Sequence, residues 1–223
     1  SIDLIYGRQY QTAEDWDDEL GAALALGLAH LSLYQLTIEP NTAFGRRFAR
    51  NRLHGLPGED LSLEFWEITQ RRCEEAGMPS YEVSNHAKEG AQSRHNLLYW
   101  SGGDWAGIGP GAHGRLTLGP NRFATTTELH PETWLAQVET QGNGERERYA
   151  LSPEERLDET VLMGLRLRNG LDLGRAAHLG WAPPEDVVED LEGLGLIAVE
   201  NGQLAATPEG RPLLNAIIEK LLV

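Results

Sequence analysis

Two apolar segments separated by one helix-like segment open the chain, and this order constrains the fold more than any other feature of the sequence. Residues 3–7 have the pattern of a short buried strand that ends in a turn. Thr12 can cap a helix with Asp15 three residues later, and apolar side chains then recur every four residues until Gly27. Residues 31–38 are apolar and rich in strand-forming residues. A strand, a helix and a second strand within about 35 residues predict a βαβ unit and therefore a parallel sheet.

The middle of the chain alternates between helical patterns and irregular segments. Residues 61–77 have an amphipathic helical pattern, residues 80–84 alternate like a strand, and a further helix begins at Pro131. Residues 85–120 are rich in glycine, histidine and aromatic residues and show little helical period. A stretch of that length is too long for a plain loop, so we expect it to line something. The glycine-rich segment 141–144 is a candidate linker.

The last third of the chain has a different pattern. Ser152 and Glu155 form a capping box at the start of a helix. Three helical patterns, two strand-like runs on either side of Asn201-Gly202 and a closing helix make up the rest, and Asn-Gly is a strong hairpin signal. The sequence therefore predicts an α/β protein with two domains, residues 1–145 and a helical, winged-helix-like domain at residues 146–223.

The charge balance argues against nucleic acid as a partner. The chain of 223 residues has a formal net charge of −15. From residue 151 onward it holds six lysine or arginine residues and thirteen aspartate or glutamate residues. The helix after Pro184, which would enter a DNA groove, carries five carboxylates and would repel phosphate. Residues 44–53 hold the only basic cluster along the sequence. We expect no DNA binding, even at the low salt that favours it.

The single cysteine, Cys73, excludes a disulfide framework and any metal site built from cysteines alone within this chain. Because it lies at helical spacing from Thr69 and Ala76, we expect it to be a small packing residue, in a protein of the reducing cytoplasm. No apolar run approaches the ~18 residues that a transmembrane segment needs. A strand-like segment directly follows Ser1, so we expect no signal peptide and a sequence that begins inside a domain.

Residues 109–114 match the pattern G-x-G-x-x-G, which is a weak signal for dinucleotide binding. That motif should open a helix, yet the residues that follow contain Gly119-Pro120 and no helical pattern. We therefore predict a tight turn that lets the backbone approach another element closely.

The glycine-rich stretch contains three histidines and three aromatic residues: His86, His95, His113, Tyr99, Trp100 and Trp105. Neutral imidazole is a common ligand of haem iron, and aromatic side chains suit the flat face of a porphyrin. On the residues alone, a structural hydrogen-bonding role is the more common explanation for such a histidine.

Several segments together resemble one family, the oxygen-independent coproporphyrinogen oxidase-like radical S-adenosylmethionine (SAM) proteins. The similar segments are residues 2–7, 11–12, 31–40, 42–44, 81–87, 93–100 and 107–114 and the tail from residue 151. The sequence His-Asn-Leu-Leu-Tyr-Trp from His95 to Trp100 is similar to a signature of the haem-chaperone branch. The combination of these motifs is specific to the family, and the resemblance covers essentially the whole chain.

The resemblance implies the C-terminal part of a partial (β/α)6 radical SAM barrel followed by the winged-helix-like domain. In the family the barrel holds a [4Fe-4S] cluster through three cysteines, and SAM binds the open iron. Asp3 corresponds to a position at a strand end that contacts SAM, and Thr37 is a weaker candidate on the next strand. We expect the two side chains to lie side by side at the open end of the parallel strands. His95 corresponds to the candidate haem ligand. The implied cofactors are therefore SAM, the [4Fe-4S] cluster and haem.

Two departures from the family pattern stand out. A cluster needs three thiolates and this chain offers only Cys73, so the cluster ligands would lie upstream of Ser1. In addition, Arg8-Gln9-Tyr10 replaces the usual Leu-Pro-Gly beside the SAM site.

The resemblance favours a haem-binding chaperone that delivers haem to haem-accepting proteins. The alternative is an enzyme, the oxygen-independent coproporphyrinogen III oxidase, in which a SAM-derived radical attacks propionate side chains. A third possibility is a docking protein without a cofactor. Two roles for His95 stay open at this point: an axial ligand of haem, or a side chain that holds the glycine-rich stretch in place.

Overall fold

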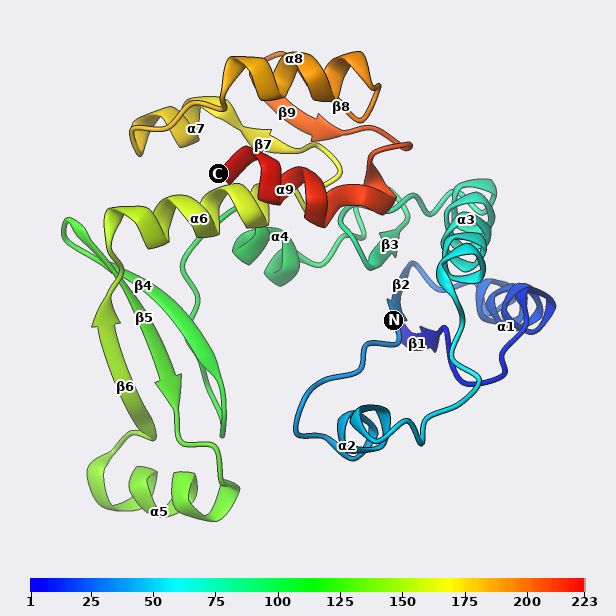
Figure 1. The fold of residues 1–223 in the computed structure, drawn as a ribbon. Helices are drawn as coiled ribbons and strands as arrows, with labels where there is room; N and C mark the ends of the chain where they lie inside the picture. Colours follow the sequence, from blue (N-terminus) through cyan, green and yellow to red (C-terminus); the bar gives the residue numbers. More distant parts are fainter. Residues whose placement is uncertain (223) are drawn as a thin grey trace. The chain divides into compact units, whose positions relative to one another are not determined.

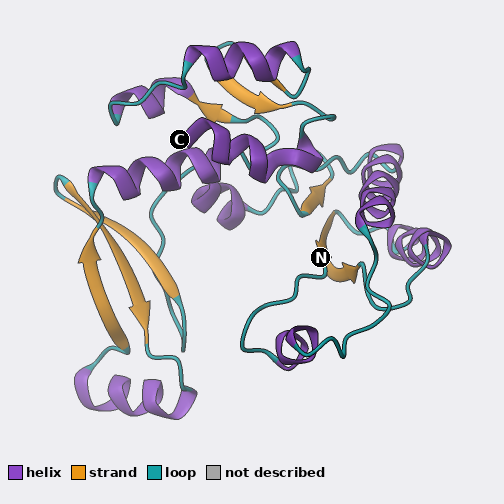
Figure 2. Cartoon of the chain, in the orientation of Figure 1, coloured by secondary structure: helices purple, strands orange, loops and turns teal. Residues whose placement is uncertain are grey.

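A computed structural model of the chain describes residues 1–222, and it divides them into two compact units, residues 1–93 and 94–222. Figure 1 labels the elements along the chain, and Figure 2 distinguishes the helices from the strands. Both units combine helices with small sheets, which confirms the predicted α/β class. The predicted domain boundary at residue 145 lies inside the second unit and stays a prediction.

The first unit is a three-stranded sheet covered by two helices. Its elements are β1 (Ile2–Tyr6), α1 (Ala13–Ala25), β2 (His30–Gln35), α2 (Ala43–Ala49), α3 (Glu59–Glu75) and β3 (Asn85–Ala87). Strand β1 pairs in parallel with β2, as the βαβ pattern predicts, and β2 pairs antiparallel with β3. Helices α1 and α3 pack side by side (Figure 1).

The helix start predicted at Thr12 is present in full. The Thr12 hydroxyl accepts from the Asp15 N–H, and the Asp15 carboxylate accepts from the Thr12 N–H at 2.9 Å. The predicted second helix also ends where expected, because Gly77 follows α3 with a left-handed φ of 66°. These caps satisfy amide and carbonyl groups that a helix end leaves without partners.

The core of the first unit lies between the sheet and the two helices. Trp16 and Phe65 are fully buried, and the Trp16 ring stacks on Tyr6 at a centroid distance of 5.1 Å. The Trp16 indole N–H donates to the Thr69 hydroxyl at 2.9 Å. Cys73 is fully buried in the same cluster, so its predicted role as a small packing residue is confirmed.

The strand predicted at residues 80–84 is wrong, because these residues form a turn and the strand follows at Asn85–Ala87. The Tyr81 N–H donates to the Asn85 carbonyl at 3.0 Å, which closes the turn. The buried Glu82 carboxylate accepts from the Asn85 side chain. Local hydrogen bonds of this kind compete with strand pairing, and the apolar alternation does not reveal them.

The second unit contains two three-stranded antiparallel sheets and several helices. Its elements are α4 (Arg94–Trp100), β4 (His113–Leu118), β5 (Asn121–Thr127), α5 (Pro131–Gln141), β6 (Glu145–Ala150), α6 (Pro153–Gly164), β7 (Leu171–Asp172), α7 (Leu173–His178), α8 (Glu185–Gly193), β8 (Ile197–Glu200), β9 (Gln203–Ala206), a 3-10 turn (Arg211–Leu213) and α9 (Leu214–Leu222). The sheets have the orders β4-β5-β6 and β7-β9-β8.

The local signals of the second unit are confirmed. Ser152 and Glu155 make the capping box that starts α6. Asn201 and Gly202 have φ values of 52° and 77° in the tight turn between β8 and β9. The segment 141–144, predicted as a linker, instead lies within the second unit and joins the end of α5 to β6, a strand of the β4-β5-β6 sheet.

The glycine-rich stretch contains a helix that its composition did not predict. Helix α4 has only seven residues, so its periodic signal is short, and helices of that length depend on tertiary packing. The tight turn predicted within residues 109–114 is confirmed at residues 109–111, and β4 rather than a helix begins at His113. A Cβ on Gly114 would lie 2.7 Å from the Gly107 amide nitrogen, so the two backbones approach closely.

Candidate functional site

Helix α4 presents His95 at the protein surface with an aromatic residue beside it. His95 and Tyr99 are one helical turn apart, and their rings meet edge to face at a centroid distance of 5.6 Å. The Tyr99 ring lies 4.8 Å from the Trp100 ring and 6.0 Å from the Trp105 ring. The structure therefore gathers His95 and the three aromatic residues that the sequence singled out into one cluster.

The remaining two histidines of the stretch do not join this cluster. His86 is buried in β3, where its Nε2 lies 3.5 Å from the Gln70 amide nitrogen. His113 begins β4 with its ring exposed, and its backbone carbonyl accepts from the Trp105 indole N–H at 3.0 Å. Of the three, His95 combines an exposed ring with an aromatic neighbour.

Two arginines flank Trp105 and extend the aromatic cluster. The guanidinium carbons of Arg115 and Arg122 lie 5.8 Å and 6.0 Å from the Trp105 ring centroid. Arg115 forms a two-pronged ion pair with Glu159 on α6, at 2.5 Å and 3.0 Å. Arg122 pairs with Asp104 at 3.1 Å. Ion pairs thus connect the β4-β5 sheet both to α6 and to the segment after α4.

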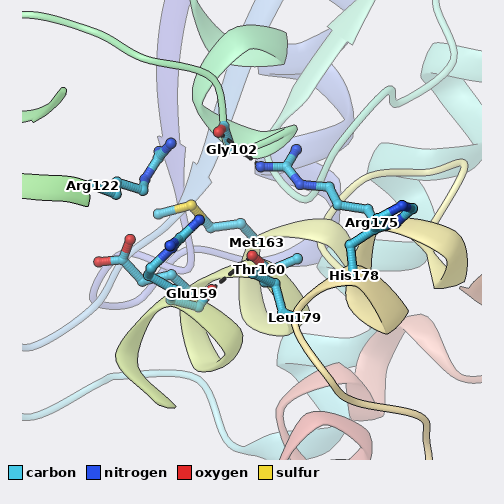
Figure 3. Close-up of a pocket in the computed structure, with 9 residues that line it drawn as sticks. Gly102, Arg122, Glu159, Thr160, Met163, Arg175, His178 and Leu179 are labelled. Atoms are coloured by element: carbon cyan, nitrogen blue, oxygen red, sulfur yellow. Dashed lines mark hydrogen bonds between the residues drawn. The ribbon is translucent and has the colours of Figure 1, made fainter. Parts of the chain in front are cut away.

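A cavity of about 230 Å³ lies next to these ion pairs (Figure 3). Its walls come from the end of α4, from β5, from α6 and from α7. The lining residues are Gly102, Arg122, Arg156, Glu159, Thr160, Met163, Arg175, His178 and Leu179. Arginine is therefore the most frequent residue in the wall, although the chain as a whole is acidic.

A larger groove of about 630 Å³ shares three lining residues with this cavity: Gly102, Thr160 and Arg175. Trp100 lines the groove at the end of α4, and the β7-β9 sheet contributes the opposite wall. Its volume is in the range of sites that bind small organic ligands.

Sequence reasoning missed the arginine cavity. The sequence shows one basic cluster, at residues 44–53, whereas the cavity collects Arg122, Arg156 and Arg175 from three separate elements. The available signal was that basic residues are scarce after residue 151, and two of them, Arg156 and Arg175, line the cavity. Spacing alone could not show that they meet.

Asp3 and Thr37, predicted to contact SAM, lie in the first unit. The pairing of β1 with β2 places Asp3 opposite Ser32, whereas Thr37 follows the last residue of β2, Gln35. The expectation that the two side chains lie side by side is therefore wrong, since about five residues of strand separate their levels, roughly 16 Å. The parallel register follows from the order of the elements, but the sequence does not fix where each strand begins.

The chain does not offer the ligands of an iron-sulfur cluster. Within residues 1–222, no group of three histidine, cysteine or carboxylate side chains is placed to hold a metal ion. Burial raises the pKa of the Cys73 thiol to about 12, so a thiolate at this position is disfavoured. Among these same residues, no helix is long and apolar enough to span a membrane.

Comparisons with known proteins give consistent results. The family model described as the HemN C-terminal domain matches residues 151–213. The chain is 35% identical over 227 residues to "Heme chaperone HemW" of Mycobacterium tuberculosis, and the match covers 100% of this chain and 55% of that protein. It is 36% identical over 238 residues to "Radical S-adenosyl methionine domain-containing protein 1, mitochondrial" of Mus musculus, with 100% and 52% covered.

The fold also matches a solved structure. Coproporphyrinogen III oxidase (HemN) from Escherichia coli, described as a radical SAM enzyme, superposes with a TM-score of 0.73 at 20% identity, over 98% of this chain and 54% of that chain. The fold is therefore that of a mixed α/β radical SAM protein. The sequence matches then confirm the resemblance found from the motifs: over its whole length the chain is similar to coproporphyrinogen oxidase-like radical SAM proteins. It spans about half the length of the curated relatives that it matches.

Proposed function

We propose that the protein is a haem-binding chaperone on a radical SAM scaffold, which passes haem to haem-accepting proteins. The observation that carries the proposal is the surface position of His95 on α4, with Tyr99 beside it. It is supported by relatives named heme chaperone in Mycobacterium tuberculosis and Bacillus subtilis, at 35% and 33% identity.

The residues around His95 fit an axial haem ligand. An exposed imidazole can turn one ring nitrogen toward iron, and the edge of Tyr99 and the ring of Trp100 provide flat apolar surface next to it. Haem when bound would supply an iron centre for this ligand, and the chain would supply the imidazole and the aromatic contacts.

SAM and the [4Fe-4S] cluster belong to the proposal through the family, and this chain offers candidate contacts for SAM but no ligands for the cluster. The cluster ligands would come from a part of the protein upstream of Ser1. Of the two candidate SAM contacts, Thr37 lies beyond the carboxyl end of β2, where barrel ligands bind, which supports it. Asp3 is the second residue of β1 and has no such support. We retain both as candidates.

The finer fold assignment is also part of the proposal. The parallel β1-α1-β2 unit is consistent with the end of a partial (β/α)6 barrel. The order α6, β7, α7, α8, β8, β9, with strand order β7-β9-β8, is consistent with a winged-helix-like domain within residues 146–223. We propose that this acidic domain docks or packs, and that nucleic acid is not its ligand. For the compartment we keep the cytoplasm as a prediction, although several relatives are named mitochondrial.

Replacement of His95 tests the haem proposal. We expect His95→Ala to shift the Soret band of bound ferric haem and to weaken haem binding roughly tenfold. A tenfold change corresponds to the loss of one favourable contact of about 1.4 kcal/mol. Because His95 is exposed, the thermal midpoint of the His95→Ala protein should stay close to that of the unmodified protein. If His95 instead holds the glycine-rich stretch in place, the midpoint should fall by several degrees.

His130→Ala provides the matched control, since His130 is an exposed histidine of the same unit that precedes α5. It should leave both the haem spectrum and the affinity unchanged. A folded His95→Ala protein with the original Soret band and the original affinity would exclude His95 as the ligand. The oxidase alternative has support from the HemN-like fold and from the match to the HemN C-terminal domain, and neither by itself defines an activity.

A further inference from the structure

Positive charge gathers around the small cavity in a protein that is otherwise strongly acidic. Three arginines and one glutamate line it. Each of the two ion pairs at its edge, Arg122 with Asp104 and Arg115 with Glu159, is neutral as a whole. The guanidinium groups of Arg156 and Arg175 are therefore in excess over the carboxylates at the small cavity, in a chain with a net charge of −15. The adjoining groove adds two carboxylates, Asp172 and Glu200.

Hydrogen bonds hold two of the arginine side chains, Arg122 and Arg175, and Arg122 is also shielded from water. The Arg122 side chain is only 12% exposed, and besides Asp104 it donates to the Gly103 carbonyl at 2.9 Å. Burial lowers the pKa of Arg122; attraction from Asp104 and Glu159 opposes this shift, and weaker repulsion from Arg175 and Arg115 adds to it. Arg175 donates to the Gly102 carbonyl at 2.9 Å, a neutral acceptor that leaves its charge uncompensated.

Figure 3 shows Arg122 and Arg175 extending into the cavity region from opposite sides, with Thr160 and Met163 of α6 below them. A planar guanidinium presents parallel N–H donors that match the two oxygens of a carboxylate. Water and salt screen a charge less where it is partly buried, as Arg122 and Arg156 are, whereas Arg175 is exposed.

We infer that this cavity is a carboxylate-binding site, with Arg156 and Arg175 as the side chains that bind the anion. Its volume of about 230 Å³ accommodates a carboxylate group and some water but not a porphyrin ring. Arg175 and Thr160 also line the adjoining groove of about 630 Å³, and Trp100 lines the same groove. The combination fits a flat apolar ligand that carries a carboxylate at its edge.

The cavity is connected to the proposed haem ligand through ring contacts. His95 touches Tyr99, Tyr99 lies 6.0 Å from Trp105, and Arg122 lies 6.0 Å from the Trp105 ring. The inference rests on the proposed function and assigns the carboxylate to a porphyrin propionate. A small free carboxylate has the same group chemistry, so the test must separate these two sources.

The test uses a porphyrin without iron, so that His95 ligation does not enter the result. Fluorescence titration with protoporphyrin IX and with its dimethyl ester compares a ligand that has free carboxylates with one that has none. We expect the unmodified protein to prefer the free acid by roughly tenfold or more, and the Arg156→Gln/Arg175→Gln protein to lose this preference. Arg175→Lys should restore only part of it, because an ammonium lacks the paired donors.

Arg148→Gln is the matched control, because it removes one positive charge from an exposed pair with Glu145 on β6. It should keep the preference for the free acid. A second titration uses succinate and is monitored by calorimetry, and it detects binding of a small free carboxylate.

The outcomes separate this inference from the haem proposal. Arginine-dependent preference for the free acid supports both. Arginine-dependent succinate binding without porphyrin binding supports the carboxylate site and contradicts the haem function. If the doubly substituted protein binds both porphyrins and succinate as the unmodified protein does, or if the unmodified protein binds none of the three, the carboxylate site is wrong.

Discussion

Trp16 in the first unit and Trp105 in the second show two uses of the same side chain. Trp16 is fully buried, stacks on Tyr6 and donates its indole N–H to Thr69. Trp105 is partly exposed, lies between two guanidinium groups and donates to a backbone carbonyl. The first unit is thus stabilised mainly by an apolar core, whereas the region after α4 depends on arginines and aromatic rings at a partly open surface. Such a surface leaves rings and guanidinium groups partly in contact with solvent, where burial stabilises the fold less.

The largest expected effect tests the apolar side of this comparison. Trp16→Ala removes a fully buried ring and should destabilise the first unit by ~3–5 kcal/mol. Trp105→Ala loses two cation-π contacts and one hydrogen bond, so we expect about 1–2 kcal/mol in the second unit. Hydrogen exchange of backbone amides in urea reports each unit separately. Equal losses for the two substitutions would contradict the comparison.

A smaller effect is expected where backbones approach each other in the second unit. A Cβ on Gly114 would lie 2.5 Å from the Thr125 hydroxyl oxygen and 3.1 Å from the Trp105 carbonyl. Gly114→Ala should therefore destabilise the second unit by about 1–3 kcal/mol through overpacking. A loosened Trp105 should also reduce the preference for free carboxylates, since the Trp105 ring contacts Arg122.

Gly193→Ala is the control, since no atom lies within 4 Å of its added Cβ at the end of α8. It should be neutral or stabilising by up to ~1 kcal/mol, because alanine favours helix. Thermal melts of both variants give the comparison. A Gly114→Ala protein as stable as the Gly193→Ala protein would show that the close approach relaxes without cost.

The smallest effect concerns the one carboxylate buried in the first unit's turn. Burial raises the pKa of Glu82 and outweighs the hydrogen bonds from Asn85 and Ser84, which lower it. The folded protein therefore binds this proton more tightly than the unfolded chain does. The resulting stabilisation is complete below the unfolded pKa and is lost as the pH rises through the folded pKa.

Glu82→Gln stays neutral at every pH and should remove this loss. The variant should gain stability relative to the unmodified protein as the pH is raised from mildly acidic to neutral, in urea titrations of the first unit. Glu64→Gln, on the exposed side of α3, should track the unmodified protein across the range. A stability difference between Glu82→Gln and the unmodified protein that does not change with pH would contradict the raised pKa of Glu82.

Signals that act within a few residues predicted much of the fold correctly. The caps at Thr12 and Ser152, the Asn201-Gly202 turn and the burial of Cys73 follow from neighbours along the chain. The family, too, was identified from contiguous motifs such as His95–Trp100. The turn at residues 80–84 was missed because the Glu82–Asn85 side-chain hydrogen bond that accompanies it comes from residues that a strand pattern tolerates.

The sequence by itself therefore determined the parallel β1-α1-β2 unit, the helix ends, the hairpin and the family, since each depends on local spacing. Only the tertiary structure decided that Asp3 and Thr37 lie at different levels of the sheet. It also decided that Arg122 and Arg175 meet at one cavity. The physical reason is that strand register and charge clustering arise from contacts between residues tens of positions apart, and packing of whole elements, not spacing along the chain, sets those contacts.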